Sequence, residues 1–301
     1  MYISEYLHIS SGRHQDLPFF NINLEHDTKM FLDPANIFVS EDKWSLRAQT
    51  ILDDYFLHLK EAFEKDDENC LRYLFSHGHE PNYTMLGYGE YRNGKGNTAH
   101  GLLYSFNELR RLYARGIKLT NINDMKLCFP GFANDGLSDL ITNLLTKVLT
   151  DFTHEVCDEF GVPYYFYGFP SERLWHWDCD HLKKGGWRPL YDSMLLVRGM
   201  PVLLVPKQWV RSTLFGGPAF FVWHIILDEI QNSLSTKRLK VSKKVIRAGL
   251  KQGDKELARG KLLRDPDSLK LYHQLLWKRS DDMVLSDCEL DFYAGIGNNI
   301  G

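Results

Sequence analysis

The spacing of hydrophobic residues predicts several helices. Between Ser45 and Glu64 apolar residues recur mostly three and four positions apart, as on one face of an amphipathic helix. The same period runs over residues 137–160, and Gly161 follows it as a residue suited to closing a helix. We also expect helices over residues 98–115 and 219–234, and helical patterning in the basic stretch that follows them.

Short apolar or alternating runs predict strands. The candidate strands cover residues 17–24, 30–33, 71–75, 125–129, 190–197 and 200–206. Arg198 and Gly199 separate the last two and predict a hairpin. A tight turn is expected at residues 130–136, between the strand at 125–129 and the long helix.

These elements predict an α+β protein. A mixed α/β core is expected over residues 1–215 as a candidate catalytic or sensing domain, followed by a helical basic domain over residues 216–301. The boundary is placed at Gly216-Gly217-Pro218, where helix-breaking residues cluster.

Composition indicates a folded protein of a reducing compartment. The chain has 301 residues, of which 44% are hydrophobic, enough for one large core or two smaller ones. Its five cysteines are irregularly spaced and odd in number, which argues against a disulfide framework. The longest apolar run, residues 219–227, is much shorter than the roughly 20 residues of a membrane span. We therefore expect a cytoplasmic protein that neither is secreted nor crosses a membrane.

Residues 237–264 form a basic block in a chain whose net charge is −3. The block holds eleven Lys and Arg against Asp254 and Glu256, which favours binding of a phosphate polymer. Trp223, Tyr272 and Trp277 flank the block and could stack on unpaired bases. The candidate nucleic-acid contacts are Lys240, Lys243, Lys244, Arg247 and Lys251. Two alternatives stay open: an anionic protein partner, such as the acidic body of a second copy, or a solvated helix face.

A glycine-rich loop over residues 87–96 is a second candidate phosphate contact. Gly89 and Gly94-Lys95 match the spacing of a phosphate-cradling loop, with Lys95 as the cation. Gly96 stands where such a loop carries the hydroxyl that holds Mg²⁺. The loop could therefore bind a nucleotide, hold a phosphate of nucleic acid, or be a plain connection.

Three carboxylates are candidate ligands of a catalytic Mg²⁺. Glu80 precedes the glycine loop, and Asp135 and Asp139 lie around the start of the 137–160 helix. Carboxylate oxygens suit Mg²⁺, which can activate water for phosphodiester cleavage. Lys207 is the candidate stabiliser of the developing charge, and Asn143 is an added polar contact one turn after Asp139. Alternatively, these residues have structural roles only. Asp135 would fix its turn, Asp139 would lie in the first helical turn, where the helix dipole favours an anion, and Lys207 would be solvated.

Two histidine-containing segments are weaker metal candidates. His176 to His181 offers His, Cys and Asp ligands, with His154 and Cys157 upstream, but it lacks the paired short spacings of a structural zinc site. The alternative is a loop whose tryptophans pack on the body. The pair in His77-Gly78-His79 lacks a third ligand.

Several segments within about the first 210 residues resemble a set of uncharacterised bacterial proteins encoded near mobile elements and phage-defence genes. The resemblance rests on residues 17–22 with 31–34, 80–82 with 86–89, 136–143 and 201–207. It implies a defence setting, in which nucleases are frequent effectors.

Taken together, we expect a nucleic-acid-binding protein, with DNA ahead of RNA, and a Mg²⁺-dependent nuclease as the candidate activity. One alternative is a non-enzymatic adaptor or sensor that recognises a phage component or a partner subunit. Another is a nucleotide-binding protein that uses the glycine loop. A homo-oligomer is compatible with each.

Overall fold

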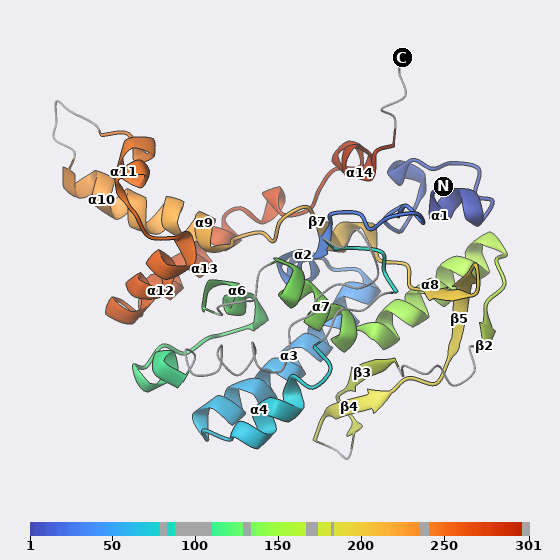
Figure 1. Cartoon of the computed structure of the whole chain (residues 1–301), viewed down its shortest axis with the longest axis horizontal. Helices are drawn as coiled ribbons and strands as arrows, with labels where there is room; N and C mark the ends of the chain where they lie inside the picture. Colours follow the sequence, from blue (N-terminus) through green and yellow to red (C-terminus); the bar gives the residue numbers. More distant parts are fainter. Residues whose placement is uncertain are drawn as a thin grey trace.

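The computed structural model describes residues 1–78, 83–87, 110–128, 134–166, 174–181, 184–234 and 241–296 (Figure 1). The helices are α1 Ile3–Tyr6, α2 Pro34–Val39, α3 Lys43–Glu64, α4 Glu68–Leu74, α6 Met125–Cys128, α7 Asn134–Leu144, α8 Thr146–Phe160, α9 Pro218–Phe221, α10 Leu227–Leu234, α11 Lys243–Gly249, α12 Asp254–Arg264, α13 Ser268–Trp277 and α14 Asp287–Ala294. The strands are β1 Phe31–Leu32, β2 Tyr165–Phe166, β3 Trp175–Asp178, β4 Gly186–Pro189, β5 Ser193–Val197, β6 Met200–Val202 and β7 Val210–Arg211. The fold is α+β, as predicted.

Helix α3 runs through the middle of the molecule (Figure 1). The Asp42 side chain begins it by accepting hydrogen bonds from the backbone N–H groups of Trp44 and Ser45. Its apolar face is buried at Leu52 and Tyr55, among others, in the core shared with α2, α7 and α8. The predicted amphipathic helix is confirmed.

The predicted helix at 137–160 is present as α7 and α8, with a bend between them at Leu145. The hydroxyl of Thr146 donates to the carbonyls of Thr142 and Asn143, a back-bonding pattern that often bends helices. Helix α8 ends at Gly161, whose φ of 67° is left-handed, as the sequence predicted.

The described strands form three small antiparallel sheets, with orders β1-β7, β2-β5-β6 and β3-β4. Strands β5 and β6 are the predicted hairpin. Arg198 and Gly199 both have positive φ, 53° and 79°, which suits the tight turn of a two-residue hairpin.

Three strand predictions are wrong. Residues 71–75 fall mostly in α4, which the Asp67 side chain caps by accepting from the N–H of Cys70. Residues 125–128 are helix α6, which follows a 3₁₀ turn over Ile122–Asp124. Residues 17–24 join no named strand and make only isolated bridges, from Phe19 to Pro206 and from Asn23 to Tyr2. Short apolar runs fit a buried helix as well as a strand, and the capping residues decide between them.

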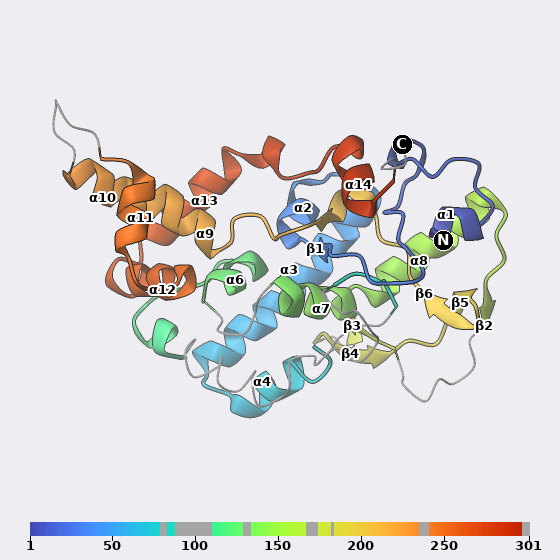
Figure 2. The same ribbon diagram turned by 45° about the horizontal axis from the view of Figure 1, so that its top comes forward.

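The C-terminal third is helical, as predicted. Helices α9 to α13 gather at one end of the molecule, and the helix predicted at 219–234 contains a wider, π-helical turn over Val222–Ile226 (Figures 1 and 2). Within the described part of the chain, no helix is both long and apolar enough to cross a membrane.

Helix α14 lies away from the other C-terminal helices and packs beside the N-terminal segment (Figure 2). The Nδ1 atom of buried His14 lies 2.7 Å from a carboxylate oxygen of Asp291, and the Nε2 atom accepts from the N–H of Asn21 at 3.0 Å. These partners hold the ring neutral, with its proton on Nδ1.

Candidate nucleic-acid interface

Several predicted site residues lie outside the described residues. These are Glu80, Lys95 and Lys240, together with the loop at 88–96. Asp135 belongs to α7, but its side chain is not described. The predicted grouping of Glu80 with Asp135 and Asp139 therefore stays a prediction.

Asp139 and Lys207 are both described. Asp139 is 7% exposed in α7, and its backbone carbonyl accepts from the side-chain amide of Asn143 at 3.0 Å. Lys207 forms an ion pair with Asp287 of α14 at 2.7 Å and donates to the carbonyl of His14. Lys207 is thus anchored where α14 meets the N-terminal segment.

The described side chains do bring together one group that could hold a metal ion. Asp151, His154 and Asp192 each place one ligand atom within 4.8 Å of the others. Lys147 lies between the two carboxylates, bonded to Asp151 and 3.3 Å from Asp192, and Arg47 also bonds Asp151 at 2.9 Å. These two cations already balance the two carboxylates. Burial alone would raise the pKa of Asp151, but the bonds from Lys147 and Arg47 lower it below its ordinary value.

The sequence analysis missed this cluster because its members come from distant segments. Asp151 and His154 share a face of α8, whereas Asp192 directly precedes β5. The spacing of Lys147, Asp151 and His154 along one helix face is the local signal that could have indicated it.

The zinc candidates take part in aromatic packing. Trp177 is buried on β3 and donates through its indole N–H to Asp54 at 2.7 Å. His77 stacks on Trp175, with ring centroids 4.0 Å apart. Burial raises the pKa of the Cys157 thiol to about 11, and burial followed by nearby Asp54 raises that of Cys179 to about 12. Without a metal, both thiols therefore stay protonated at neutral pH. Zinc binds the thiolate, so each thiol would first have to lose its proton, which disfavours zinc binding.

Part of the charge of the basic block is used inside the molecule. Lys243 pairs with Asp228 at 2.7 Å, and Lys261 pairs with Glu229 at 2.6 Å, so acids of α10 face bases of α11 and α12. Arg247 pairs with Asp254 at 2.8 Å. The predicted contacts Lys244 and Lys251 are exposed to solvent. The block is therefore less cationic than its sequence suggests.

A hollow of about 440 Å³ lies between α10 and α11. Trp223 lines it with a residue exposure of 38%, and Nζ of Lys243 lies 5.7 Å from the centroid of its ring. Lys243 also donates to the backbone carbonyl of Trp223 at 2.9 Å, which holds the ammonium beside the indole. The other lining residues are Gln231, Val241, Ser242 and Lys244. An exposed aromatic ring beside two cations can stack on a base while the cations meet its phosphates.

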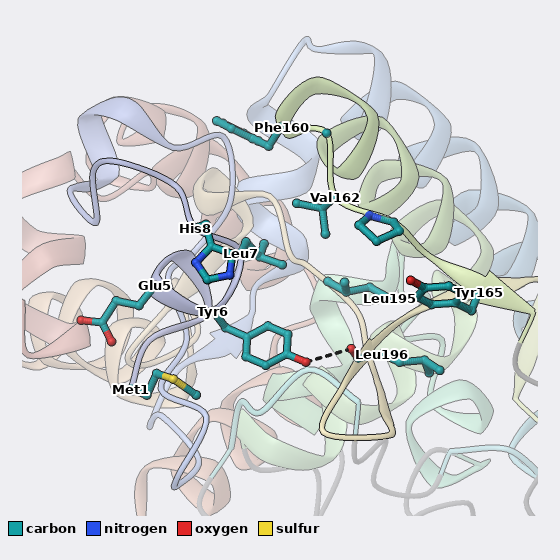
Figure 3. A pocket seen from close by; sticks show the side chains of 12 residues that line it. Met1, Glu5, Tyr6, Leu7, His8, Phe160, Val162, Tyr165, Leu195 and Leu196 are labelled. Atoms are coloured by element: carbon teal, nitrogen blue, oxygen red, sulfur yellow. Dashed lines mark hydrogen bonds between the residues drawn. The ribbon is translucent and has the colours of Figure 1, made fainter.

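A larger cavity, of about 620 Å³, lies at the opposite end of the molecule between α1, the end of α8 and β5 (Figure 3). Its lining is mainly apolar and aromatic, and the hydroxyl of Tyr6 donates to the carbonyl of Leu196 at 3.5 Å. Glu5 and His8 also line it. This lining suits an apolar group better than a phosphate polymer.

Residues 8–215 match the model of a family described as a domain of unknown function (DUF8370). The matched segment ends before α9. Neither the curated proteins nor the solved structures include a match to this chain.

Proposed function

Because this chain belongs to the DUF8370 family and carries its basic helices beyond the matched segment, we propose that these helices bind single-stranded nucleic acid beside a family core. The Trp223 hollow is the contact site, with Lys243 and Lys244 as its cations. DNA is expected ahead of RNA, in the cytoplasm of a cell that uses the protein against foreign DNA. The defence setting rests on the sequence resemblance alone.

The observation that supports this proposal is the exposed indole of Trp223 under the ammonium of Lys243. A large aromatic side chain normally gains by burial, so an exposed ring fixed beside a cation is suited to a flat partner. Stacking of a base on such a ring contributes about 1–3 kcal/mol. Lys244 is exposed at the start of α11 and can neutralise a phosphate at the rim of the hollow.

The test is fluorescence anisotropy of a labelled DNA strand at low salt, repeated with duplex DNA and with RNA of the same sequence. We expect Trp223→Ala to weaken binding of the strand by about 5-fold or more, because the stacking platform is lost. Lys244→Gln should reduce the slope of log affinity against log salt by about 0.7.

Phe292→Ala is the matched control. Phe292 is also an exposed aromatic of the C-terminal third, 66% accessible, but it lies on α14, away from α10 and α11 (Figure 2). The Phe292→Ala variant should bind the labelled DNA strand with the affinity of the wild type. A wild-type protein that does not bind at low salt, or a Trp223→Ala variant that binds as well as the wild type, would refute the proposal.

A further inference from the structure

Three arginines from two distant segments line one cavity. Arg111 and Arg115 are separated by one helical turn, in and just after the described helical residues 110–114, and Arg259 comes from α12. The stretch and α12 lie side by side in both views (Figures 1 and 2). The cavity measures about 380 Å³. Its other described lining residues are Leu112 and Leu263.

The lining combines positive charge with an apolar floor. Leu112 is completely buried, and no acidic residue is found among the described lining residues. Arg111 and Arg259 also interact with other groups of the protein, and Arg115 is exposed. Guanidinium groups stay charged at all physiological pH values, so an anion in the cavity meets donors that keep their positive charge. Charge-assisted hydrogen bonds from such donors to phosphate oxygens are stronger than neutral ones.

We propose that this cavity binds two linked phosphate groups, either as free pyrophosphate or as the phosphate chain of a nucleotide. A guanidinium group donates two parallel hydrogen bonds to a phosphate, which makes arginine the preferred residue for such groups. A volume of about 380 Å³ lies within the range of small-ligand sites.

The site goes beyond the proposed function and does not depend on it. No residue is shared between the arginine cavity and the Trp223 hollow. Arg111 and Arg115 also lie outside the basic block of residues 237–264, whereas Arg259 lies within it. A failure of DNA binding would therefore leave this inference intact, and the reverse also holds.

The experiment is calorimetric titration of the full chain with pyrophosphate, ATP and adenosine. We expect pyrophosphate and ATP to bind and adenosine not to bind. Arg115→Gln and Arg259→Gln should each weaken binding by about 10-fold or more, because a charge-assisted hydrogen-bonding pair is lost. Equal affinities for pyrophosphate and ATP would assign the site to the phosphates alone, and tighter binding of ATP would assign it to a nucleotide.

Arg264→Gln is the control, because it removes the same charge from an exposed position of the same helix outside the cavity. The affinity of Arg264→Gln for pyrophosphate should stay within 2-fold of that of the wild type. Arg115 is exposed, so its substitution should not unfold the chain, and circular dichroism verifies this. Absence of pyrophosphate binding to the wild type, equal losses in Arg264→Gln and Arg115→Gln, or adenosine binding as tight as that of ATP would each overturn the inference.

Discussion

The ammonium of Lys243 lies 2.7 Å from the carboxylate of Asp228. This pair joins α11 to α10 and places the cation beside the Trp223 ring. It also means that a phosphate must compete with Asp228 for Lys243. The acid therefore fixes the position of the cation and weakens its field at the same time.

We predict that Asp228→Asn strengthens binding of single-stranded DNA by about 3-fold at low salt, because one competing negative charge is removed. Anisotropy titrations at several salt concentrations measure this effect. Glu61→Gln serves as the control, since Glu61 pairs with Lys65 on the exposed side of α3. Weaker binding by Asp228→Asn would show that positioning of Lys243 matters more than its free charge.

The nuclease hypothesis is tested at Asp139. If Asp139 is a ligand of a catalytic Mg²⁺, Asp139→Asn should lower Mg²⁺-dependent cleavage of DNA by about 100-fold or more and leave DNA affinity within 2-fold. Gel assays of cleavage and anisotropy measure the two effects separately. Because Asp139 is 7% exposed, the melting temperature of the variant must also be compared with that of the wild type.

A wild-type protein that binds DNA without cleaving it in Mg²⁺ would instead support the adaptor or sensor hypothesis. Binding partners would then be sought with the intact chain, because the family core and the basic helices could each contact a different component. The same result would remove Glu80, Asp135 and Lys207 as catalytic candidates.

Acid should destabilise the folded chain at the buried ring of His14. Burial lowers the pKa of His14, and nearby Lys207 lowers it further against the opposing effect of Asp291. The unfolded chain therefore binds a proton near pH 6.5, where the folded chain does not. Stability should fall as the pH drops from about 6.5 through the folded-state pKa of His14.

Melting temperatures between pH 7.5 and pH 5 measure this dependence. His14→Asn keeps a side-chain donor for Asp291 but cannot be protonated in this range, so its decline should be flatter than that of the wild type. Parallel declines for the two proteins would contradict the prediction.

Asp291 contributes in a lower pH window. Burial alone would raise its pKa, but hydrogen bonds from His14 and Arg13 lower the pKa below its ordinary value. The stability that Asp291 provides is present above about pH 3.9 and is lost as the pH falls through its folded-state pKa. Stability measured over both pH ranges therefore separates the contribution of His14 from that of Asp291.

Local signals account for the parts of the fold that the sequence predicted. The apolar period of α3 and the Arg198-Gly199 turn depend on neighbouring residues only. The runs at 71–75 and 125–129 are too short for hydrophobicity to distinguish helix from strand. There the capping bond from Asp67 to the N–H of Cys70 was the missing information.

The candidate sites depend on contacts between distant residues, which a single sequence does not reveal. Trp223 was recognised as a stacking residue, but the pairing of Lys243 with Asp228 was not. The arginine cavity joins Arg115 to Arg259 across the packing of two segments. Charge counts along the chain therefore overstated the free charge of the basic block. They also overlooked the concentration of positive charge in the arginine cavity.

The hydroxyl of Tyr2 donates to the carbonyl of Ala294 at 2.9 Å, so α14 and α1 are neighbours. Cutting the chain after residue 215 would delete Asp287 and Asp291 and leave Lys207 and His14 without these partners. The isolated family segment would then expose a surface that the intact chain covers. An internal deletion that keeps α14 and joins it to the core by a flexible linker would preserve that surface while removing the nucleic-acid contacts.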